Sequence, residues 1–281
     1  MRSLLKKLGH EFVYGGHPAS LSAAAIVWSL IIISGQLGGF SIVLMAYFAS
    51  QIVYNYDHLK EGIKGNYERT IYLMKTKKLQ TFLFMFYIFG FIITAFYTAF
   101  LATLWFVFII FGGVLYTSWF KRFTKHLIGF KNFYVSFFWS SLVIPVMFHY
   151  SLFSLFSLFV VFFIFIFERG LMNTIFFDIK DVKSDRLAKL RTFPVELGVE
   201  KTLRLLHFIN ISSFATLVFG VLLGLLPVFS LSLVLFYFYG LYYLSAVGNV
   251  STAGLKKFSY FIVDGECLLW PLVLMIGKLL V

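Results

Sequence analysis

Three aspartates follow one another at intervals of three and four residues, as Asp178, Asp181 and Asp185, directly after a long apolar run that ends at Phe177. On a helix, residues three and four apart share one face, so the three carboxylates would point the same way. Basic residues stand between and after them, as far as Arg191. Carboxylates can hold Mg²⁺, and Lys and Arg can hold the phosphates that Mg²⁺ bridges. The stretch therefore predicts diphosphate chemistry on a lipid-soluble substrate at a membrane surface.

A second group of acids lies earlier in the chain, where Asp57 and Glu61 are four residues apart and face the same way on a helical end. The two groups of acids follow the second and the sixth apolar segments, which are four segments apart. This spacing suggests that the chain consists of two similar halves. A diphosphate carries several negative charges and cannot lie beside bare carboxylates. One or two Mg²⁺ ions between them would solve this problem, because Mg²⁺ prefers oxygen ligands.

The composition is that of a polytopic, all-α membrane protein. The chain has 281 residues, of which 60% are hydrophobic and 13% charged, whereas a soluble domain has about 25% charged residues. A membrane span needs about 20 mostly apolar residues. We expect nine spans, at 19–35, 38–56, 81–99, 101–119, 133–149, 152–177, 203–224, 227–247 and 259–279.

The segment 1–17 precedes the first span. Its basic residues Arg2, Lys6 and Lys7 alternate with Leu and Phe, which predicts an amphipathic helix at the membrane interface. Lys6 and Lys7 interrupt the apolar run, so the segment does not have the pattern of a signal peptide. We expect residues 18–281 to form one nine-helix domain.

Basic residues fix the expected orientation. The segments 1–17, 57–80, 120–132, 178–204 and 248–258 hold almost all of them. By the positive-inside rule these segments are cytoplasmic, which places the N-terminus inside and the C-terminus outside. The net charge of +12 is then a one-sided basic surface that attracts anionic lipid. No nucleic-acid partner is needed to explain it.

The text from Phe177 to Gly198, FDIKDVKSDRLAKLRTFPVELG, resembles the second aspartate-rich motif of the UbiA-type intramembrane prenyltransferases. The acid spacing, the basic run, the Thr-x-Pro turn and the final Leu-Gly all fit. The expected span plan extends the resemblance to nearly the whole chain. It implies a ring of helices around a central, lipid-accessible cavity, with a Mg²⁺-dependent site near the cytoplasmic end that transfers an isoprenoid from a diphosphate to an acceptor.

Carried over residue by residue, the resemblance implies Mg²⁺ ligands at Asp178, Asp181 and Asp185. It implies contacts to the diphosphate from residues that match other family positions: Asn173 in the sixth span, Tyr116, Lys121 and Arg122 after the fourth, and Lys131, the first residue of a Lys-Asn pair that opens the fifth.

The first motif departs from the family pattern, which is Asn, then Asp four residues later, then Asp after four more. Asp57 and Glu61 fill the two acid positions here, and Val53 stands at the Asn position. Asn55 can substitute if the helix end is unwound. The text resembles a divergent branch that reads Tyr-Asn-x-Asp with Glu-Arg further on. The resemblance implies Asp57 and Glu61 as metal ligands, with Asn55 and Arg69 on the diphosphate.

The sequence thus predicts a prenyltransferase whose catalytic acids are Asp57, Glu61, Asp181 and Asp185. Its expected partners are an isoprenyl diphosphate donor, membrane lipid and a lipophilic acceptor, of aromatic, quinone type. Two alternatives stay open at this point. The altered first motif is compatible with a homologue that binds prenyl diphosphate without catalysis. A secondary transporter is the other alternative. Transporters carry their charges near the bilayer midplane, whereas most acids here lie at the expected cytoplasmic ends of the spans, which argues against transport.

Four charged residues fall within expected spans, where buried charge is costly and is usually paired or functional. Glu168 and Arg169 either pair with each other or with another helix, or serve the site. Asp264 and Glu266 either snorkel to the cytoplasmic surface or, for Asp264, face the cavity. We expect a structural role for these last two.

Overall fold

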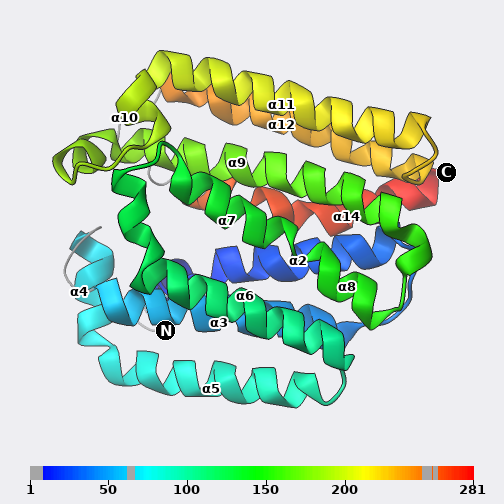
Figure 1. Cartoon of the computed structure of the whole chain (residues 1–281), viewed down its shortest axis with the longest axis horizontal. Helices are drawn as coiled ribbons and strands as arrows, with labels where there is room; N and C mark the ends of the chain where they lie inside the picture. The colour runs from blue at the N-terminus through cyan, green and yellow to red at the C-terminus, as the bar shows by residue number, and fades with distance from the viewer. Residues whose placement is uncertain (1–8, 62–66, 249–254, 256–258) are drawn as a thin grey trace.

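A computed structural model of the chain describes residues 9–61, 67–248, 255 and 259–281, without the side chains of 61, 67–70, 260 and 261. Every regular element in this part of the chain is helical. The longer elements, shown in Figure 1, are α2 (His17–Ile33), α3 (Phe40–Glu61), α4 (Tyr67–Lys75), α5 (Lys77–Ala95), α6 (Phe100–Ser118), α7 (Phe130–Ser140), α8 (Val143–His149), α9 (Phe156–Leu187), α10 (Phe193–Leu197), α11 (Val199–Leu222), α12 (Leu235–Ser245) and α14 (Glu266–Leu280).

The expected all-helical membrane fold is confirmed, and the chain is an integral membrane protein. Within the described residues, five helical segments are long and apolar enough to cross a bilayer: Lys77–Ala95, Phe100–Ser118, Phe153–Leu187, Val199–Leu222 and Val228–Ser245. The other expected spans also coincide with helices, but these are shorter, broken or more polar. The count of nine spans stays a prediction.

Two expected spans are interrupted. The one at 133–149 divides into α7 and α8 around Ser141 and Leu142. The last one begins as a π-helical turn, Ser259–Val263, which ends at a turn before α14 starts at Glu266. Hydropathy alone does not place such breaks, because mostly apolar segments lie on both sides of each one.

The helices pack around an apolar core. Helix α3 lies against α2, α5 and α6, and α9 lies against α7 and α11, while α14 packs on α2 and joins the two groups. Large side chains such as Leu30, Phe162 and Trp270 are fully buried. Outer faces carry exposed Phe residues, for example Phe82 and Phe89, as expected where lipid covers the surface.

The ends of α3 and α9 that carry the acids lie at the same end of the molecule as α4 and α10, on the left of Figure 1, whereas the C-terminus lies at the other end. Residues 9–14 are helical at the same end, and residues 1–8 of the expected amphipathic segment lie outside the described residues. Glu11 joins this segment to the bundle, because its Oε2 accepts hydrogen bonds from Tyr72 Oη at 2.6 Å and Gln80 Nε2 at 2.8 Å. Burial opposes its ionisation, but the nearby His17, with Nε2 3.8 Å from Oε1, and these two bonds lower the pKa of Glu11.

Two loops dock on each other beside the second motif. The Arg191 N–H donates to the carbonyl of Thr124 at 2.9 Å, and the Gly129 N–H donates to the carbonyl of Arg191 at 3.0 Å. Gly129 precedes α7 with a φ of +67°, a left-handed conformation that suits glycine. A Cβ on Gly129 would lie 2.3 Å from the Phe193 ring. The loop after the acids is thereby fixed against the start of α7.

Gly129→Ala is expected to lower the free energy of unfolding by about 2 kcal/mol or more, because it combines left-handed strain with a clash against Phe193. Gly38→Ala is the matched control, since Gly38 also has a positive φ, of +78°, but has open space around the added Cβ. Thermal unfolding in detergent measures both. Equal losses of stability would show that the contact with Phe193 contributes nothing.

Candidate active site

The three aspartates of the second motif lie on α9, which continues as one 32-residue helix past the apolar run to Leu187. A helix of this length measures about 48 Å, which exceeds the hydrocarbon core of about 30 Å. The charged end therefore stands outside the apolar layer. Asp178 is buried, Asp185 is partly buried, and Asp181 keeps 41% of its side chain exposed. Asp181 and Asp185 are therefore more accessible than Asp178.

Asp178 is held by the first turn of α7. Lys131 Nζ donates to its Oδ1 at 2.9 Å, and Asn132 Nδ2 donates to its Oδ2 at 2.8 Å. The Asp178 charge raises the pKa of Lys131 above its ordinary value, which keeps the ammonium charged. Because both Asp178 oxygens have protein partners, fewer lone pairs remain for a cation on Asp178 than on Asp181 and Asp185.

Asp185 lies in an environment that disfavours its charge. Burial, followed by the negative charges of Asp178 and Asp181, raises the pKa of Asp185 to about 6, although Lys131 opposes the shift. Asp181 is paired with Lys180, whose Nζ lies 3.1 Å from Oδ2. A cation beside Asp185 would favour its ionised form and offset both unfavourable effects.

The first motif occupies the last turns of α3. Asp57 Oδ1 accepts a hydrogen bond from Thr117 Oγ1 of α6 at 2.8 Å. Asn55 is 1% exposed, and neither atom of its amide has a hydrogen-bond partner among the described residues. A buried amide without partners costs about 1–3 kcal/mol, so Asn55 is poised to bond a ligand. The side chains of Glu61 and Arg69 lie outside the described residues.

The two motifs are connected by contacts between α6 and α7. Thr117 of α6 bonds Asp57, and Lys131 of α7 bonds Asp178. Tyr116, the residue before Thr117, contacts Tyr134 of α7, with ring centroids 5.2 Å apart. A short series of contacts through these two helices therefore leads from Asp57 to Asp178.

The expected diphosphate ligands divide into two groups. Lys121 and Arg122 lie on the exposed 3₁₀ turn Phe120–Lys125, and Lys131 keeps 40% of its side chain exposed. Lys131 bonds Asp178 directly, whereas Lys121 and Arg122 follow the end of α6 that carries Thr117. Asn173 differs, because its Nδ2 donates to the backbone carbonyl of Val263 at 3.1 Å and approaches Asp264 at 3.5 Å. Asn173 therefore lies against the last span.

The side chains present fit a magnesium ion that is shared with a substrate. Among the described residues, no three His, Cys, Asp or Glu side chains come close enough together to hold a metal alone. Mg²⁺ commonly binds through one or two carboxylates, with substrate phosphates and water as its other ligands. Asp181 and Asp185 offer such a pair.

The structure adds Thr117 to the site, which sequence reasoning missed. Thr117 follows Tyr116 directly, but a threonine in an apolar helix gives no functional signal of its own. Asn132 belongs to the Lys-Asn pair, yet its bond to Asp178 spans 46 residues of sequence and could not be read from spacing. Both residues act by holding an acid in position.

Thr117→Val is expected to lower kcat/KM for the diphosphate donor about tenfold, because removing a group that orients a ligand typically costs between 10-fold and 100-fold. Valine keeps the shape of threonine and removes only the bond to Asp57. Ser118→Ala is the control, since Ser118 bonds Lys60 and Tyr56 at the same helix end. Steady-state diphosphate release measures both variants. Equal kcat/KM in the two would exclude a role for the Thr117 bond.

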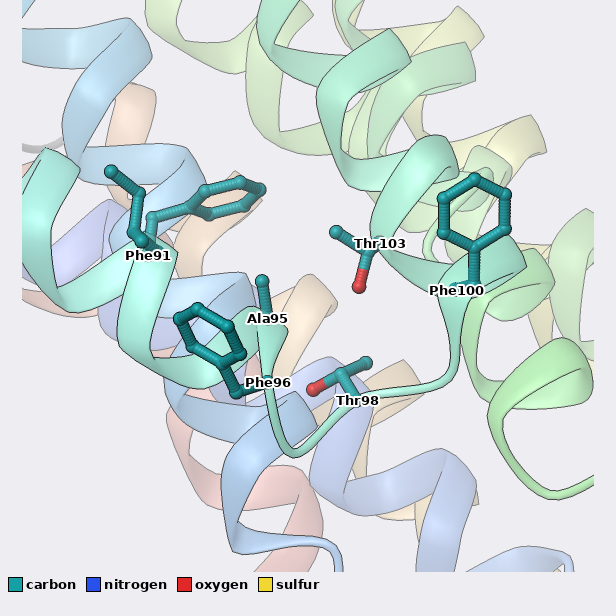
Figure 2. A pocket seen from close by; sticks show the side chains of 7 residues that line it. Phe91, Ala95, Phe96, Thr98, Phe100 and Thr103 are labelled. Carbon is teal, nitrogen blue, oxygen red and sulfur yellow. The ribbon is translucent and has the colours of Figure 1, made fainter.

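A shallow groove of about 300 Å³ lies at the other end of the molecule, between α5 and α6 (Figure 2). Phe91, Ala95, Phe96 and Phe100 line it, with the hydroxyls of Thr98 and Thr103 nearby. None of its lining residues is ionisable. The groove therefore offers nothing to a charged diphosphate, and the acids at the opposite end remain the candidate site.

The fold and the acid-bearing helix ends define a helical integral membrane protein with charged groups gathered beyond one end of its apolar layer. The model of the UbiA prenyltransferase family matches residues 72–263, which is more than half of the chain. The chain therefore belongs to the UbiA prenyltransferase family. The match includes the second motif but begins after Asp57 and Glu61, so the divergent first motif lies outside it.

Solved structures show the same fold. A UbiA homologue from Aeropyrum pernix K1 has a TM-score of 0.62 at 13% identity, covering 94% of this chain and 97% of that one. A homologue from Archaeoglobus fulgidus bound to DMAPP and Mg²⁺ has a TM-score of 0.62 at 12% identity, covering 95% of this chain and 99% of that one. A structure described for digeranylgeranylglyceryl phosphate synthase has a TM-score of 0.61 at 14% identity, covering 98% of this chain and 100% of that one. A search of curated proteins finds no match.

Proposed function

We propose that the protein transfers an isoprenyl group from an allylic diphosphate to a lipophilic acceptor within the membrane. The observation that carries the proposal is the series of contacts that links Asp57 to Asp178, from the two halves of the chain, through Thr117 and Tyr116 of α6 and Tyr134 and Lys131 of α7. Membership of the UbiA family supports a prenyltransferase. Structures of family homologues with GPP or DMAPP and Mg²⁺ support the same donor class.

Asp181 and Asp185 would hold Mg²⁺ on one side of the diphosphate, with Asp57 and Glu61 on the other. When bound, Mg²⁺ neutralises negative charge on the departing diphosphate. The remaining oxygens would be bound by nearby side chains, namely Asn55, Arg69, Tyr116, Lys121, Arg122 and Lys131. Asp178 would orient Lys131 through the bond of 2.9 Å. A role for Asn173 on the diphosphate receives no support from its contacts.

Aromatic side chains on the apolar side of the acids suit the chemistry of the donor. Loss of diphosphate from an allylic carbon leaves positive charge on that carbon, and the faces of aromatic rings stabilise cations. Tyr134 lies 5.2 Å from Tyr116 and 4.9 Å from Phe138, which continues an aromatic wall toward the bilayer. Such a wall also excludes the water that would compete with the acceptor.

We further propose that residues 18–281 act as one domain, with the acids and the N-terminus on the cytoplasmic side and the C-terminus outside. The one-sided basic charge supports this orientation through the positive-inside rule. For the acceptor, we propose an aromatic, quinone-type molecule. A glycerol-phosphate lipid is the second class to test, because a structurally similar chain is described for digeranylgeranylglyceryl phosphate synthase.

The test is diphosphate release by the purified protein in detergent. Geranyl and geranylgeranyl diphosphate are supplied with 4-hydroxybenzoate or a glycerol-phosphate monoether, with Mg²⁺ or with EDTA. Release that needs both acceptor and Mg²⁺ supports the proposal and identifies the acceptor class. Metal-dependent binding of the donor without release would instead favour the non-catalytic homologue. If the protein neither binds the donor nor releases diphosphate, a role in prenyl transfer is overturned.

A further inference from the structure

Asp264 stands where the last span is interrupted. The π-helical turn Ser259–Val263 closes with the Asp264 N–H donating to the carbonyl of Ser259 at 3.1 Å, and α14 begins only at Glu266. Irregular backbone at membrane depth is tolerated where it is buried in protein or lines a cavity. Single π-helical turns also occur often at functional sites. The interruption therefore makes this point of the bundle a candidate site of ligand contact.

Two neighbouring helices support the interruption. Asn173 Nδ2 of α9 donates to the carbonyl of Val263 at 3.1 Å, and Ser22 Oγ of α2 donates to the carbonyl of Asp264 at 2.9 Å. These bonds satisfy carbonyl groups that an uninterrupted α-helix would bond itself. The turn is thus held in place from both sides, and the direction of the Asp264 side chain is fixed with it.

The carboxylate of Asp264 is poorly bonded for its position. Among the described residues, the hydrogen bond recorded for it comes from Asn173 Nδ2 at 3.5 Å, the limit of such a bond. Glu266, two residues later, shows the opposite arrangement, because Arg169 binds both of its oxygens at 2.6 Å. An ionisable residue inside a membrane protein is costly unless it is paired or functional. Glu266 is paired, whereas Asp264 retains bonding capacity and stays only partly buried.

Asp264 also lies on the bilayer side of the diphosphate acids. The negative charge of Asp264 acts on Lys180, and Lys180 Nζ bonds Asp181 at 3.1 Å. Its neighbour Asn173 precedes Asp181 by eight residues on α9, a rise of about 12 Å along the helix. A diphosphate at Asp181 and Asp185 would direct its allylic carbon and prenyl tail toward this level. The acceptor must approach the same carbon from there.

We propose that Asp264, oriented by Asn173, binds the acceptor by accepting a hydrogen bond from its hydroxyl group. This inference rests on the proposed prenyl transfer and adds the side chain that recognises the acceptor. It selects acceptors that carry an O–H or N–H donor next to the carbon that becomes prenylated, or a hydroxyl whose own oxygen becomes prenylated. Phenols and glycerol-phosphate monoethers both meet this requirement. The diphosphate donor, which lacks such a group, does not contact Asp264.

The test compares the KM values of the two substrates in Asp264→Ala, with 4-hydroxybenzoate or the glycerol-phosphate monoether as acceptor and geranylgeranyl diphosphate as donor. The acceptor KM is expected to rise at least about tenfold, as for loss of one charged hydrogen bond, while the donor KM stays within about twofold. Glu168→Gln is the control, because Glu168 is an acid of the same helix bundle that bonds Ser212 and Thr216 away from the site.

Four outcomes are distinguishable. A rise of the acceptor KM alone in Asp264→Ala, with Glu168→Gln unchanged, supports the proposal. Equal changes in both KM values would show a structural role and overturn it. Unchanged KM values would overturn it as well. If the wild-type protein transfers to none of the acceptors, the prenyl-transfer proposal itself fails and this inference falls with it.

Discussion

Asp181→Ala is expected to lower Mg²⁺-dependent diphosphate release at least about 100-fold, the loss typical when a group that stabilises transition-state charge is removed. Asp181 keeps 41% of its side chain exposed, compared with 2% for Asp178. Its salt bridge is to Lys180, an adjacent residue on the same helix. Removing it should therefore leave the packing of the bundle unchanged and remove one carboxylate from the metal site.

The control is Glu196→Gln in the same cytoplasmic segment. Glu196 pairs with Arg191 at 2.8 Å on the surface, and exposed pairs contribute about 0–1 kcal/mol. Its diphosphate release is expected to stay within about twofold of the wild type, and Asp181→Ala should unfold at the wild-type temperature. A catalytic loss matched by Glu196→Gln, or no loss in Asp181→Ala, would contradict the assigned metal site.

The second motif could be predicted from the sequence because its information is local. Spacings of three and four residues place Asp178, Asp181 and Asp185 on one face, and α9 does continue through them to Leu187. The different roles of the three acids could not be predicted. Asp178 is bonded by Lys131 and Asn132, 47 and 46 residues away. Spacing shows which acids share a face, whereas tertiary contacts decide which of them are already paired.

The fold shows a similar division. Long apolar runs predicted helices at the correct places, because burial in lipid demands about 20 apolar residues per span. The interruptions at Ser141 and Asp264 were not foreseen, since they depend on side chains of other helices, such as Asn173, that bond the freed carbonyls. From the sequence, a structural role was expected for Asp264 as well as for Glu266. Without knowing the partner of Glu266, sequence alone could not separate the two acids.

The partner of Arg169 was the other point that sequence left open. The pair is interhelical: Arg169 Nε and Nη2 both bond Glu266 at 2.6 Å, and Nη1 bonds Asn210 at 2.7 Å. Glu168, its neighbour in sequence, bonds Ser212 and Thr216 instead. Successive residues of a helix point about 100° apart, so Glu168 and Arg169 do not face each other. The pair joins α9 to α14 across the centre of the bundle.

Arg169→Met is expected to lower the free energy of unfolding by about 3–5 kcal/mol, because it leaves Glu266, only 4% exposed, as a buried charge without its partner. The double variant Arg169→Met with Glu266→Met should recover most of this loss, since two apolar side chains of similar volume can replace a buried pair. Thermal unfolding in detergent compares the single and double variants. A single variant as stable as the double variant would mean that Glu266 is protonated or hydrated in the bundle. The pair would then contribute no net stability, and the contrast between a paired Glu266 and an available Asp264 would lose its physical basis.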